Sequence, residues 1–467
     1  HLADGGSVAI KSVGGYNLMC DALNEEAVAG LRKRKQRDMK PFAVMFRDID
    51  TLKRYCHTGE EEETMLLSWR RPILILRQKR PLASSVSSGL NTIGAMLPHM
   101  PVHHLLFRVI RTDAVVLTSG NLSEEPIIIS DTVAMNDLMP VTGCVVSYNR
   151  EIHNRADDSV VRMAAGNTIL IRRSRGYAPQ PVVLRSDSEG IFAAGAEQKN
   201  TFCIGKGSQA VMSQYIGDIK NVATWDYYTE TYRLFSSLFR FAPSVSVCDM
   251  HPDYLSGRFA RALADEQSLP LVKIQHHHAH AASVMAEHGL AGEVIGVIMD
   301  GTGYGSDGNI WGSEFLLATP ADFERYTHFE YFMMPGGDAA VAEPWRMALS
   351  CLYSWFGNSF DFMSLRLFRE TDEKRFVTGL EMLSKEINSP LTCGAGRIFD
   401  AVAALLQLCA TASFDSEAPM RLESAIGSRT DEYYPFSVNG CVRLSETFSA
   451  IVGDIARNEA GLVPARF

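Results

Sequence analysis

The chain has 467 residues, a length that predicts two or three domains rather than one. Hydrophobic residues make up 46% of it and charged residues 21%, the composition of a globular protein with large cores. The net charge of −9 argues against a nucleic-acid-binding platform, and the chain shows neither a long apolar run nor a signal peptide. Its nine scattered cysteines lack a CxxC pair, so we expect a reduced, cytoplasmic protein. From the charge and the apolar pattern we expect neither nucleic-acid nor membrane partners.

The first 178 residues alternate apolar runs with helical segments and predict a mixed α/β domain. Asn24, followed by two glutamates, predicts the start of a helix that ends in a run of Lys and Arg. Residues Ser159 to Arg173 predict a β-hairpin that turns at Gly166 and Asn167. The other expected strands are the apolar runs Ser7–Val13, Pro41–Phe46, Pro72–Arg77, Ala114–Ser119 and Cys144–Tyr148.

A segment rich in Pro and Ser at residues 179–189 predicts a linker, and the alternating pattern begins again at residue 190. A strand, a polar turn and a second strand follow at residues 192–205. The unit at residues 294–318 repeats this plan around a glycine-rich turn. Two such hairpins, each followed by helices, predict a duplicated α/β fold over residues 190–467, with a phosphate-facing turn in each half.

The segment Gln275 to Glu314 carries the clearest indication of chemistry. His276 and His280 are four residues apart and would share one face of a helix, while Asp300 closes the expected strand Val294–Met299. Two histidines and one carboxylate are typical of a catalytic metal site, with iron or zinc as the ion. The alternative is a histidine cluster packed in a core. No HExxH motif is present, which argues against a zincin protease.

The neighbours of these residues have different expected roles. His277 and His278 would point elsewhere on the helix, as packing or supporting groups. Gly301, Gly303 and Gly305 would leave a loop without Cβ atoms, where a phosphate can approach backbone N–H groups. The alternative for the glycines is a tight turn without a ligand.

Cations from separate parts of the first domain also converge. The run LRKRKQRDMKP ends the first helix, and Arg173 and Arg175 would lie on one face of a strand by its two-residue period. A solvated helix end explains most such runs, but converging cations repel one another unless an anion lies between them. A polyphosphate fits, and the candidate contacts are Lys35, Arg37, Lys40, Arg173 and Arg175, with Ser119 and Asn121 after the strand Ala114–Ser119.

These motifs resemble the HypF family of carbamoyltransferases, which mature nickel–iron hydrogenases. Residues 7–178 resemble its YrdC-like domain through TSGNLSEEP, HNRADDSVVR and RRSRGYAP. Residues 190 to about 425 resemble its second domain, a TsaD/Kae-like domain of the actin/Hsp70-like (ASKHA) fold. The motifs of this second part are GAEQKNTFC, QHHHAHAASVMAEHGL, DGTGYGSDGNIWGSEF, MPGGDAAVAEPWR and GRIFDAVAALL.

The resemblance implies that ATP, with Mg²⁺, activates carbamate to carbamoyl-adenylate in the first domain. The second domain would pass the carbamoyl group to the C-terminal cysteine of a HypE-like partner, with carbamoyl phosphate as the ultimate donor. A divalent iron or zinc ion would bind His276, His280 and Asp300, and Lys35, Arg37, Arg173 and Arg175 would be catalytic. The implied nucleotide contacts are Lys11, Lys40, Ser119, Asn121, Ser159, Arg162, Gly301, Gly303, Asp307, Gly312, Gly336, Gly337, Asp338, Gly396 and Asp400.

The sequence also departs from the family. The acylphosphatase domain, the zinc fingers and a late metal-binding aspartate do not appear in it, so we expect a piece of a longer protein with weak or partial metal binding. Ser416 stands where glycine is usual, adding a Cβ atom where a nucleotide would meet the backbone. Two alternatives remain open: threonylcarbamoyl transfer to tRNA, and a nucleotide-binding scaffold without turnover.

Overall fold

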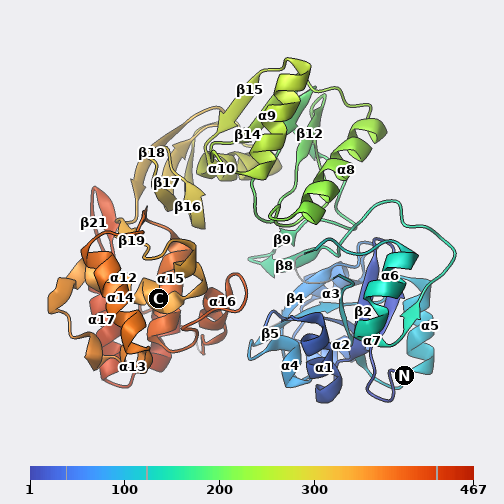
Figure 1. The fold of residues 1–467 in the computed structure, drawn as a ribbon, viewed down its shortest axis with the longest axis horizontal. Helices are drawn as coiled ribbons and strands as arrows, with labels where there is room; N and C mark the ends of the chain where they lie inside the picture. Colours follow the sequence, from blue (N-terminus) through green and yellow to red (C-terminus); the bar gives the residue numbers. More distant parts are fainter. Residues whose placement is uncertain (38, 122–124, 428–429) are drawn as a thin grey trace. The chain divides into compact units, whose positions relative to one another are not determined.

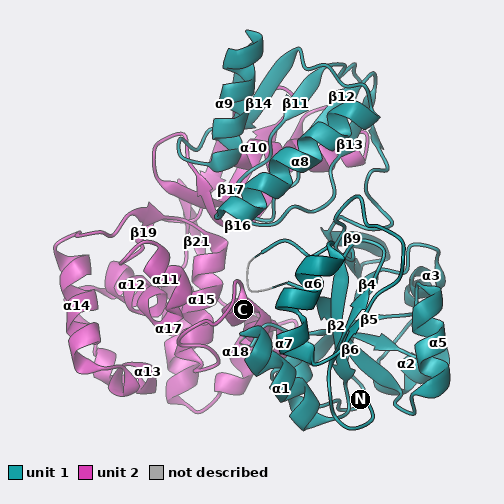
Figure 2. Ribbon diagram, turned by 45° about the vertical axis from the view of Figure 1, so that its right-hand side comes forward, with its two compact units in different colours: residues 1–273 teal, residues 274–467 magenta. Residues whose placement is uncertain are grey.

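The computed structural model describes residues 1–37, 39–121, 125–427 and 430–467. Asp38 of the basic run and residues 122–124 of the motif TSGNLSEEP therefore lie outside the described residues. The chain divides into two compact units, His1–Lys273 and Ile274–Phe467, which Figure 2 colours separately. The domain boundaries expected at residues 178 and 190 stay predictions.

Unit 1 contains a nine-stranded mixed sheet in the order β7-β1-β2-β6-β3-β5-β4-β8-β9. Leu18 and Cys20 of β2 enter one core cluster, whereas Met19 between them enters another, because successive side chains point to opposite faces of a sheet. Both faces are therefore buried, which explains why the strands are apolar throughout. The strands are β1 (Val8–Lys11), β2 (Tyr16–Asp21), β3 (Ala43–Phe46), β4 (Ile73–Arg77), β5 (Thr92–Met96), β6 (Ala114–Ser119), β7 (Val145–Val146), β8 (Val160–Ala164) and β9 (Asn167–Arg172).

Among the described residues of this part, seven helices accompany the sheet. Asn24 caps α1 as predicted, since its side chain accepts a hydrogen bond from the backbone N–H of Ala27 at 3.1 Å. The helices are α1 (Glu25–Lys35), α2 (Ile49–Tyr55), α3 (Glu60–Leu67), α4 (Ser84–Ser87), α5 (Pro101–Val109), α6 (Asp131–Asp137) and α7 (Met139–Thr142).

The second part of unit 1 is a six-stranded sheet in the order β10-β13-β12-β11-β14-β15. Helices α8 (Val222–Leu238) and α9 (Leu255–Gln267) lie across one face of it (Figures 1 and 2). The core between these layers is aromatic, with Phe192, Phe202 and Tyr228 fully buried. The strands are β10 (Val182–Val183), β11 (Ile191–Ala193), β12 (Cys203–Lys206), β13 (Gln209–Met212), β14 (Val245–Asp249) and β15 (Leu271–Ile274).

Unit 2 combines a five-stranded sheet with a helical core. The sheet has the order β16-β17-β20-β19, with β18 on β17, and a separate hairpin joins β21 to β22. The strands are β16 (Val294–Tyr304), β17 (Ile310–Ala318), β18 (Phe323–His328), β19 (Phe332–Met333), β20 (Leu391–Thr392), β21 (Ser437–Asn439) and β22 (Cys441–Arg443).

Helix α10 contacts β16 and β17, while α12 and α15 pack against each other in the helical core. The helices of unit 2 are α10 (His276–Glu287), α11 (Asp338–Ala342), α12 (Pro344–Phe356), α13 (Arg366–Glu370), α14 (Glu373–Ser384), α15 (Ala395–Leu405), α16 (Glu417–Ser424), α17 (Ser445–Ala456) and α18 (Val463–Arg466), with 3₁₀ turns at Gly357–Ser359, Phe362–Ser364 and Ala460–Leu462.

Two local predictions were wrong, and a third segment contains an element that was not predicted. The first hairpin turns at Ala165 and Gly166, one residue earlier than expected, because Ala164 pairs with Asn167. The expected linker contains β10, which pairs with β13, because Val182 and Val183 supply an apolar edge strand, and the linker itself stays a prediction. Strand β16 continues through the glycines to Tyr304, across a bulge between Met299 and Gly303, where a loop was expected.

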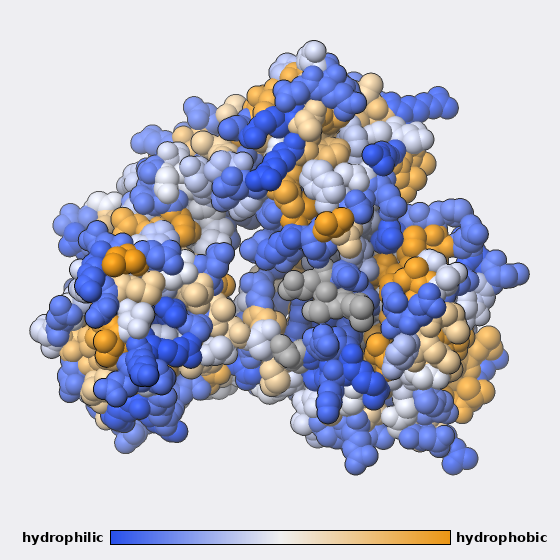
Figure 3. Space-filling model, in the orientation of Figure 1, coloured by the Kyte–Doolittle hydropathy of each residue, from blue (hydrophilic) through white to orange (hydrophobic). Residues whose placement is uncertain are grey.

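The surface is mixed in character. Figure 3 shows hydrophilic residues over much of the visible face, with hydrophobic residues in small patches. Leu105 and Val109 of α5 are among the exposed apolar side chains, at 58% and 78% exposure. Within the described part of the chain, no helix combines the length and the apolar character that crossing a membrane requires.

Candidate functional site

The two histidines of the expected metal site lie in the first turns of α10. Gln275 caps this helix, and its Oε1 atom accepts hydrogen bonds from the backbone N–H groups of His277 and His278 at 2.6 and 2.9 Å. His276 and His280 lie one turn apart, and their Nε2 atoms are 3.2 Å from each other. The predicted spacing therefore brings the two imidazoles together.

The carboxylate comes from the bulge of β16. Oδ1 of Asp300 accepts a hydrogen bond from the backbone N–H of Gly301, which turns Oδ2 toward the histidines. Oδ2 lies 3.2 Å from Nε2 of His276 and 3.9 Å from Nε2 of His280. An ion bound at about 2.0–2.2 Å holds neighbouring ligand atoms about 2.8–3.6 Å apart. The two separations of 3.2 Å lie in this range and the third is about 0.3 Å longer, so a small movement of His280 would let these three residues hold a divalent metal.

The charges of this cluster suit the same role. Burial raises the pKa of Asp300, but the contact with His276 and the nearby His280 outweigh it and hold that pKa below its usual value. Burial, with His276 beside it, lowers the pKa of His277 to about 4. At neutral pH the cluster therefore offers one ionised carboxylate beside a neutral imidazole of His277.

The neighbouring histidines differ from each other. His278 points away as expected, because its Nε2 lies 2.9 Å from the carbonyl oxygen of Thr319 and its ring stacks on Phe323. The expected direction was wrong for His277, whose Nε2 lies 3.7 Å from Oδ2 of Asp300, while its expected role as a packing or supporting group stays a prediction. The hydrogen bond from Gln275 to Nδ1 of His277 turns that ring toward the cluster.

The glycines around Asp300 leave space that protein atoms fill. A Cβ atom on Gly303 would lie 2.5 Å from the ring of His277, and one on Gly305 would lie 2.2 Å from the ring of Trp311. A Cβ on Gly312 would lie 2.7 Å from the carbonyl oxygen of Asp300, and one on Gly396 would lie 2.9 Å from Cα of Gly301. These glycines let β17 and α15 approach the bulge closely, and their expected contacts with a nucleotide stay predictions.

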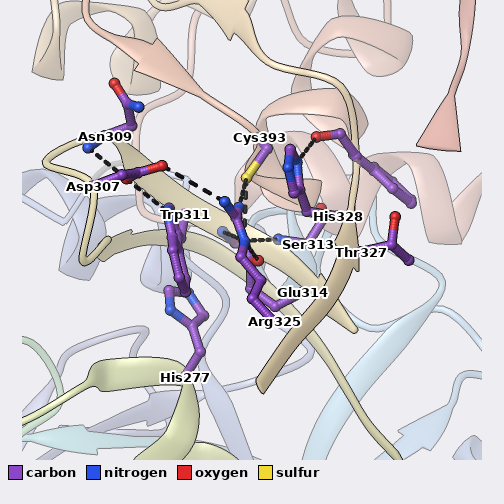
Figure 4. A network of polar contacts seen from close by, with 12 residues as sticks. His277, Asp307, Asn309, Trp311, Ser313, Glu314, Arg325, Thr327, His328 and Cys393 are labelled. Atoms are coloured by element: carbon purple, nitrogen blue, oxygen red, sulfur yellow. Dashed lines mark hydrogen bonds and ion pairs between the residues drawn. The ribbon is translucent and has the colours of Figure 1, made fainter. Parts of the chain in front are cut away.

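A charged network that the sequence reading missed lies beside the cluster (Figure 4). Glu314 is fully buried and accepts hydrogen bonds from Nε of Arg325 at 2.6 Å and from the Cys393 thiol at 3.1 Å. The Arg325 guanidinium lies 3.7 Å from the centre of the Trp311 ring, which in turn contacts the ring of His277. A charged residue in an otherwise apolar strand was the available signal for Glu314.

Asp307 belongs to this network rather than to an open loop. Its Oδ1 accepts hydrogen bonds from the backbone N–H of Asn309 and from Nε1 of Trp311, and its Oδ2 accepts one from the Tyr331 hydroxyl. Burial opposes these contacts but is outweighed, so the pKa of Asp307 is lowered to about 2. The carboxylate thus fixes the turn between β16 and β17.

The remaining predicted residues of unit 2 lie on α15 and before α11. Nη2 of Arg397 lies 2.9 Å from Oδ2 of Asp400, and burial raises the pKa of Asp400 to about 6. Gly336 and Gly337 have φ values of 92° and 55° and precede Asp338, the first residue of α11. Their roles toward a nucleotide stay predictions.

In unit 1 the structure brings three predicted residues together. The Lys35 ammonium, at the end of α1, donates hydrogen bonds to the carbonyl oxygens of Ser119 and Asn121 and to Oδ1 of Asn121 at 2.7–2.8 Å. Burial, with Arg37 nearby, lowers the pKa of Lys35 to about 7. Arg37 donates to the carbonyl oxygens of Lys40 and Pro41.

The expectation that Arg173 and Arg175 share a strand face was wrong, because β9 ends at Arg172. Arg175 pairs with Asp158 at 2.7 Å, and Arg173 donates to the carbonyl oxygen of Gln180. The sequence did not single out Arg172, which is a further cation near Lys35. Burial raises the pKa of Asp157, and the charges of Arg172 and Lys35 both oppose that rise.

Other residues predicted to contact the nucleotide interact with neighbouring residues of the protein. Lys11 is buried, pairs with Asp131 at 2.6 Å and donates to the carbonyl oxygen of Tyr148. The Ser159 hydroxyl donates to the carbonyl oxygen of Arg175. Arg162 is half-buried in β8. Their roles toward ATP stay predictions.

Family models match the chain in three consecutive parts. The Sua5/YciO/YrdC model, described as telomere recombination, matches residues 1–174. The HypF Kae1-like domain matches residues 186–287, and the second subdomain of the carbamoyltransferase Kae1-like domain matches residues 296–467. The order of a YrdC-like part followed by a Kae1-like part is therefore confirmed.

Individual relatives agree with these matches. The carbamoyltransferase HypF of Synechocystis is 37% identical over 460 residues, which cover 94% of this chain and 59% of the relative. A probable carbamoyltransferase HypF of Methanocaldococcus jannaschii is 36% identical, with 90% of this chain and 55% of the relative covered. The chain thus spans less than two thirds of the length of these curated relatives.

Solved structures extend the likeness to the fold. A full-length HypF, crystallised in a phosphate- and nucleotide-bound form, superposes with a TM-score of 0.94 at 41% identity, over 100% of this chain and 73% of that one. The T. kodakarensis HypF gives a TM-score of 0.92 at 36% identity, over 99% of this chain and 62% of that one. The chain belongs to the HypF family of carbamoyltransferases.

Proposed function

We propose that the protein activates carbamate with ATP and transfers the carbamoyl group to a cysteine thiol of an acceptor protein, as a step in hydrogenase maturation. The acceptor is a HypE-like protein with a C-terminal cysteine, and carbamoyl phosphate is the ultimate donor. Membership of the HypF family supports this proposal. The observation that carries it is the close approach of His276, His280 and Asp300.

In the first step a carbamate oxygen attacks the α-phosphorus of ATP, giving carbamoyl-adenylate and pyrophosphate. Catalysis of such a step depends on cations that hold the triphosphate in line and balance its charge. Lys35 and Arg37 supply them in this proposal, with Mg²⁺ bound to the phosphates. An ammonium has three donors, and Lys35 donates all three within the protein, so ATP must replace at least one of these bonds.

In the second step the acceptor sulfur attacks the carbamoyl carbon, AMP leaves, and the thiol proton is released. His276, His280 and Asp300 would hold a divalent iron or zinc ion, which polarises the carbamoyl carbonyl when bound. Cys393, the cysteine closest to Glu314, is not the acceptor, because burial and then Glu314 raise its pKa to about 12.

Intact-protein mass spectrometry of the acceptor tests the proposal. The protein, ATP, Mg²⁺ and carbamate should add one carbamoyl group to the acceptor, and an acceptor without its C-terminal cysteine should stay unmodified. Modification of tRNA with threonine and bicarbonate, in place of the thiol, would contradict the proposal.

A further inference from the structure

The Gln275 amide has one possible orientation. Its Oε1 atom faces the backbone N–H groups of His277 and His278, which can only donate. Its Nε2 atom lies 3.1 Å from the carbonyl oxygen of Tyr304, which can only accept. Exchanging the oxygen and the nitrogen of this amide would break both contacts, so the NH₂ group is fixed as a donor.

This orientation fixes the protonation of the neighbouring imidazole. Nε2 of Gln275 also lies 3.1 Å from Nδ1 of His277. Because the amide nitrogen donates, Nδ1 of His277 must accept and carries no proton. A neutral imidazole with a bare Nδ1 has its proton on Nε2. Gln275 therefore makes His277 a donor at Nε2.

The carboxylate of Asp300 lies close to that donor. His277 is fully buried, and its Nε2 has no hydrogen-bond partner among the residues that the structure describes. Oδ2 of Asp300 lies 3.7 Å away. A shift of about 0.7 Å would bring the two atoms to ordinary hydrogen-bond distance. An unpartnered buried donor is costly, which favours such a contact.

We propose that His277 is a positioning residue, which donates from Nε2 to Asp300 and holds this carboxylate toward the ion, while Gln275 sets its tautomer. Gly303 leaves the space for the ring, and Trp311 packs against it. Hydrogen bonds to ligating carboxylates orient them for the metal. The proposal rests on the proposed metal role of His276, His280 and Asp300, but it assigns His277 as a donor and not as a ligand.

The tautomer can be measured without any metal. Nuclear magnetic resonance of the metal-free protein, labelled with ¹⁵N in its imidazoles, should show His277 protonated at Nε2 and bare at Nδ1. The signal is assigned by its loss in H277Q. In Q275E the side-chain oxygen facing Nδ1 accepts, so the proton should move to Nδ1. A proton on Nδ1 in the unsubstituted protein would overturn the inference.

Zinc affinity tests the contact with Asp300, with Zn²⁺ alone titrated against a chromophoric chelator. H277F should weaken zinc binding by about 10- to 100-fold. H277Q should retain most of the affinity, because its amide offers a donor near the same position. H278F is the matched control, since His278 contacts Thr319 instead, and it should bind zinc as the unsubstituted protein does.

The outcomes separate the two proposals. Unchanged zinc affinity in a folded H277F protein would overturn the role of His277, and an equal loss in H277F and H277Q would make it a metal ligand, which also overturns the inference. Absence of zinc binding by the unsubstituted protein would contradict the metal site itself, while the tautomer measured without metal would still decide the assignment of His277.

Discussion

Lys35 is the residue of the expected ATP site whose charge changes near neutral pH. Its pKa is lowered to about 7, chiefly by burial. Bound phosphate would raise this pKa again, so ATP binding should take up a proton. ATP affinity should therefore fall as the pH rises above about 7, by at most tenfold for each pH unit. Calorimetry in buffers with different ionisation enthalpies measures both the affinity and the proton uptake.

The same shift has the opposite effect on the protein without ATP. Because the folded pKa of Lys35 lies below its ordinary value, the unfolded chain binds more protons than the folded chain at pH values between the two. The contribution of Lys35 to the free energy of unfolding therefore rises with pH in this range.

Lys33 is the control for the ATP-binding prediction, since it is exposed on the same helix. K33M should keep the pH dependence of ATP binding. If this pH dependence also persists in K35M, Lys35 is not the group that causes it.

His280 tests the metal cluster at the residue scale. Its Nε2 lies 3.2 Å from that of His276, and its side chain is half-exposed, so removing it should leave the fold intact. H280A should reduce bound zinc or iron in elemental analysis to background. H288A, at the exposed end of the same helix, should keep the metal content of the unsubstituted protein. Full metal content in H280A would exclude the cluster as the metal site.

At the scale of elements, the pair formed by Glu314 and Arg325 stabilises the sheet of unit 2 between β17 and β18. R325M would leave the Glu314 carboxylate buried without its partner. The free energy of unfolding should fall by about 3–5 kcal/mol, measured by urea denaturation. R366M removes an exposed pair with Glu370 and should cost no more than about 1 kcal/mol. Equal effects of the two substitutions would contradict the role of the network.

Ser416 sits before α16 with a φ of 64°, in the left-handed region. This backbone conformation is one that glycine adopts without strain. S416G should raise the stability by about 1 kcal/mol, because a Cβ atom is strained in this conformation. A higher midpoint in urea denaturation would agree, and a lower midpoint would show that the Ser416 side chain makes a compensating contact.

Local signals predicted the elements better than the contacts between them. Capping chemistry located the start of α1 at Asn24, and the apolar run Ala114–Ser119 is β6 without change. The glycines after Met299 were expected to form a loop because glycine adopts many backbone conformations. Nothing in the glycine run itself indicates that it pairs with β17. A short apolar pair inside a Pro-rich segment, at Val182, likewise gave no sign of its partner strand.

In the candidate site, too, the sequence predicted local proximity but not contacts between distant residues. The spacing of His276 and His280 within one helix was sufficient to predict their approach. The tautomer of His277 depends on Gln275 and on the carbonyl of Tyr304, a distant residue in the sequence. Similarly, the partner of Glu314 is Arg325 on another strand. Only tertiary structure brings such pairs together.

At the scale of the whole molecule, we propose that this chain makes an activated carbamoyl group before transferring it. ATP–pyrophosphate exchange measures this activation directly and needs no acceptor protein. We predict exchange when carbamate is supplied, a loss of that exchange in K35M, and no added exchange with threonine. Exchange that appears with threonine and bicarbonate but not with carbamate would contradict the proposed carbamate activation.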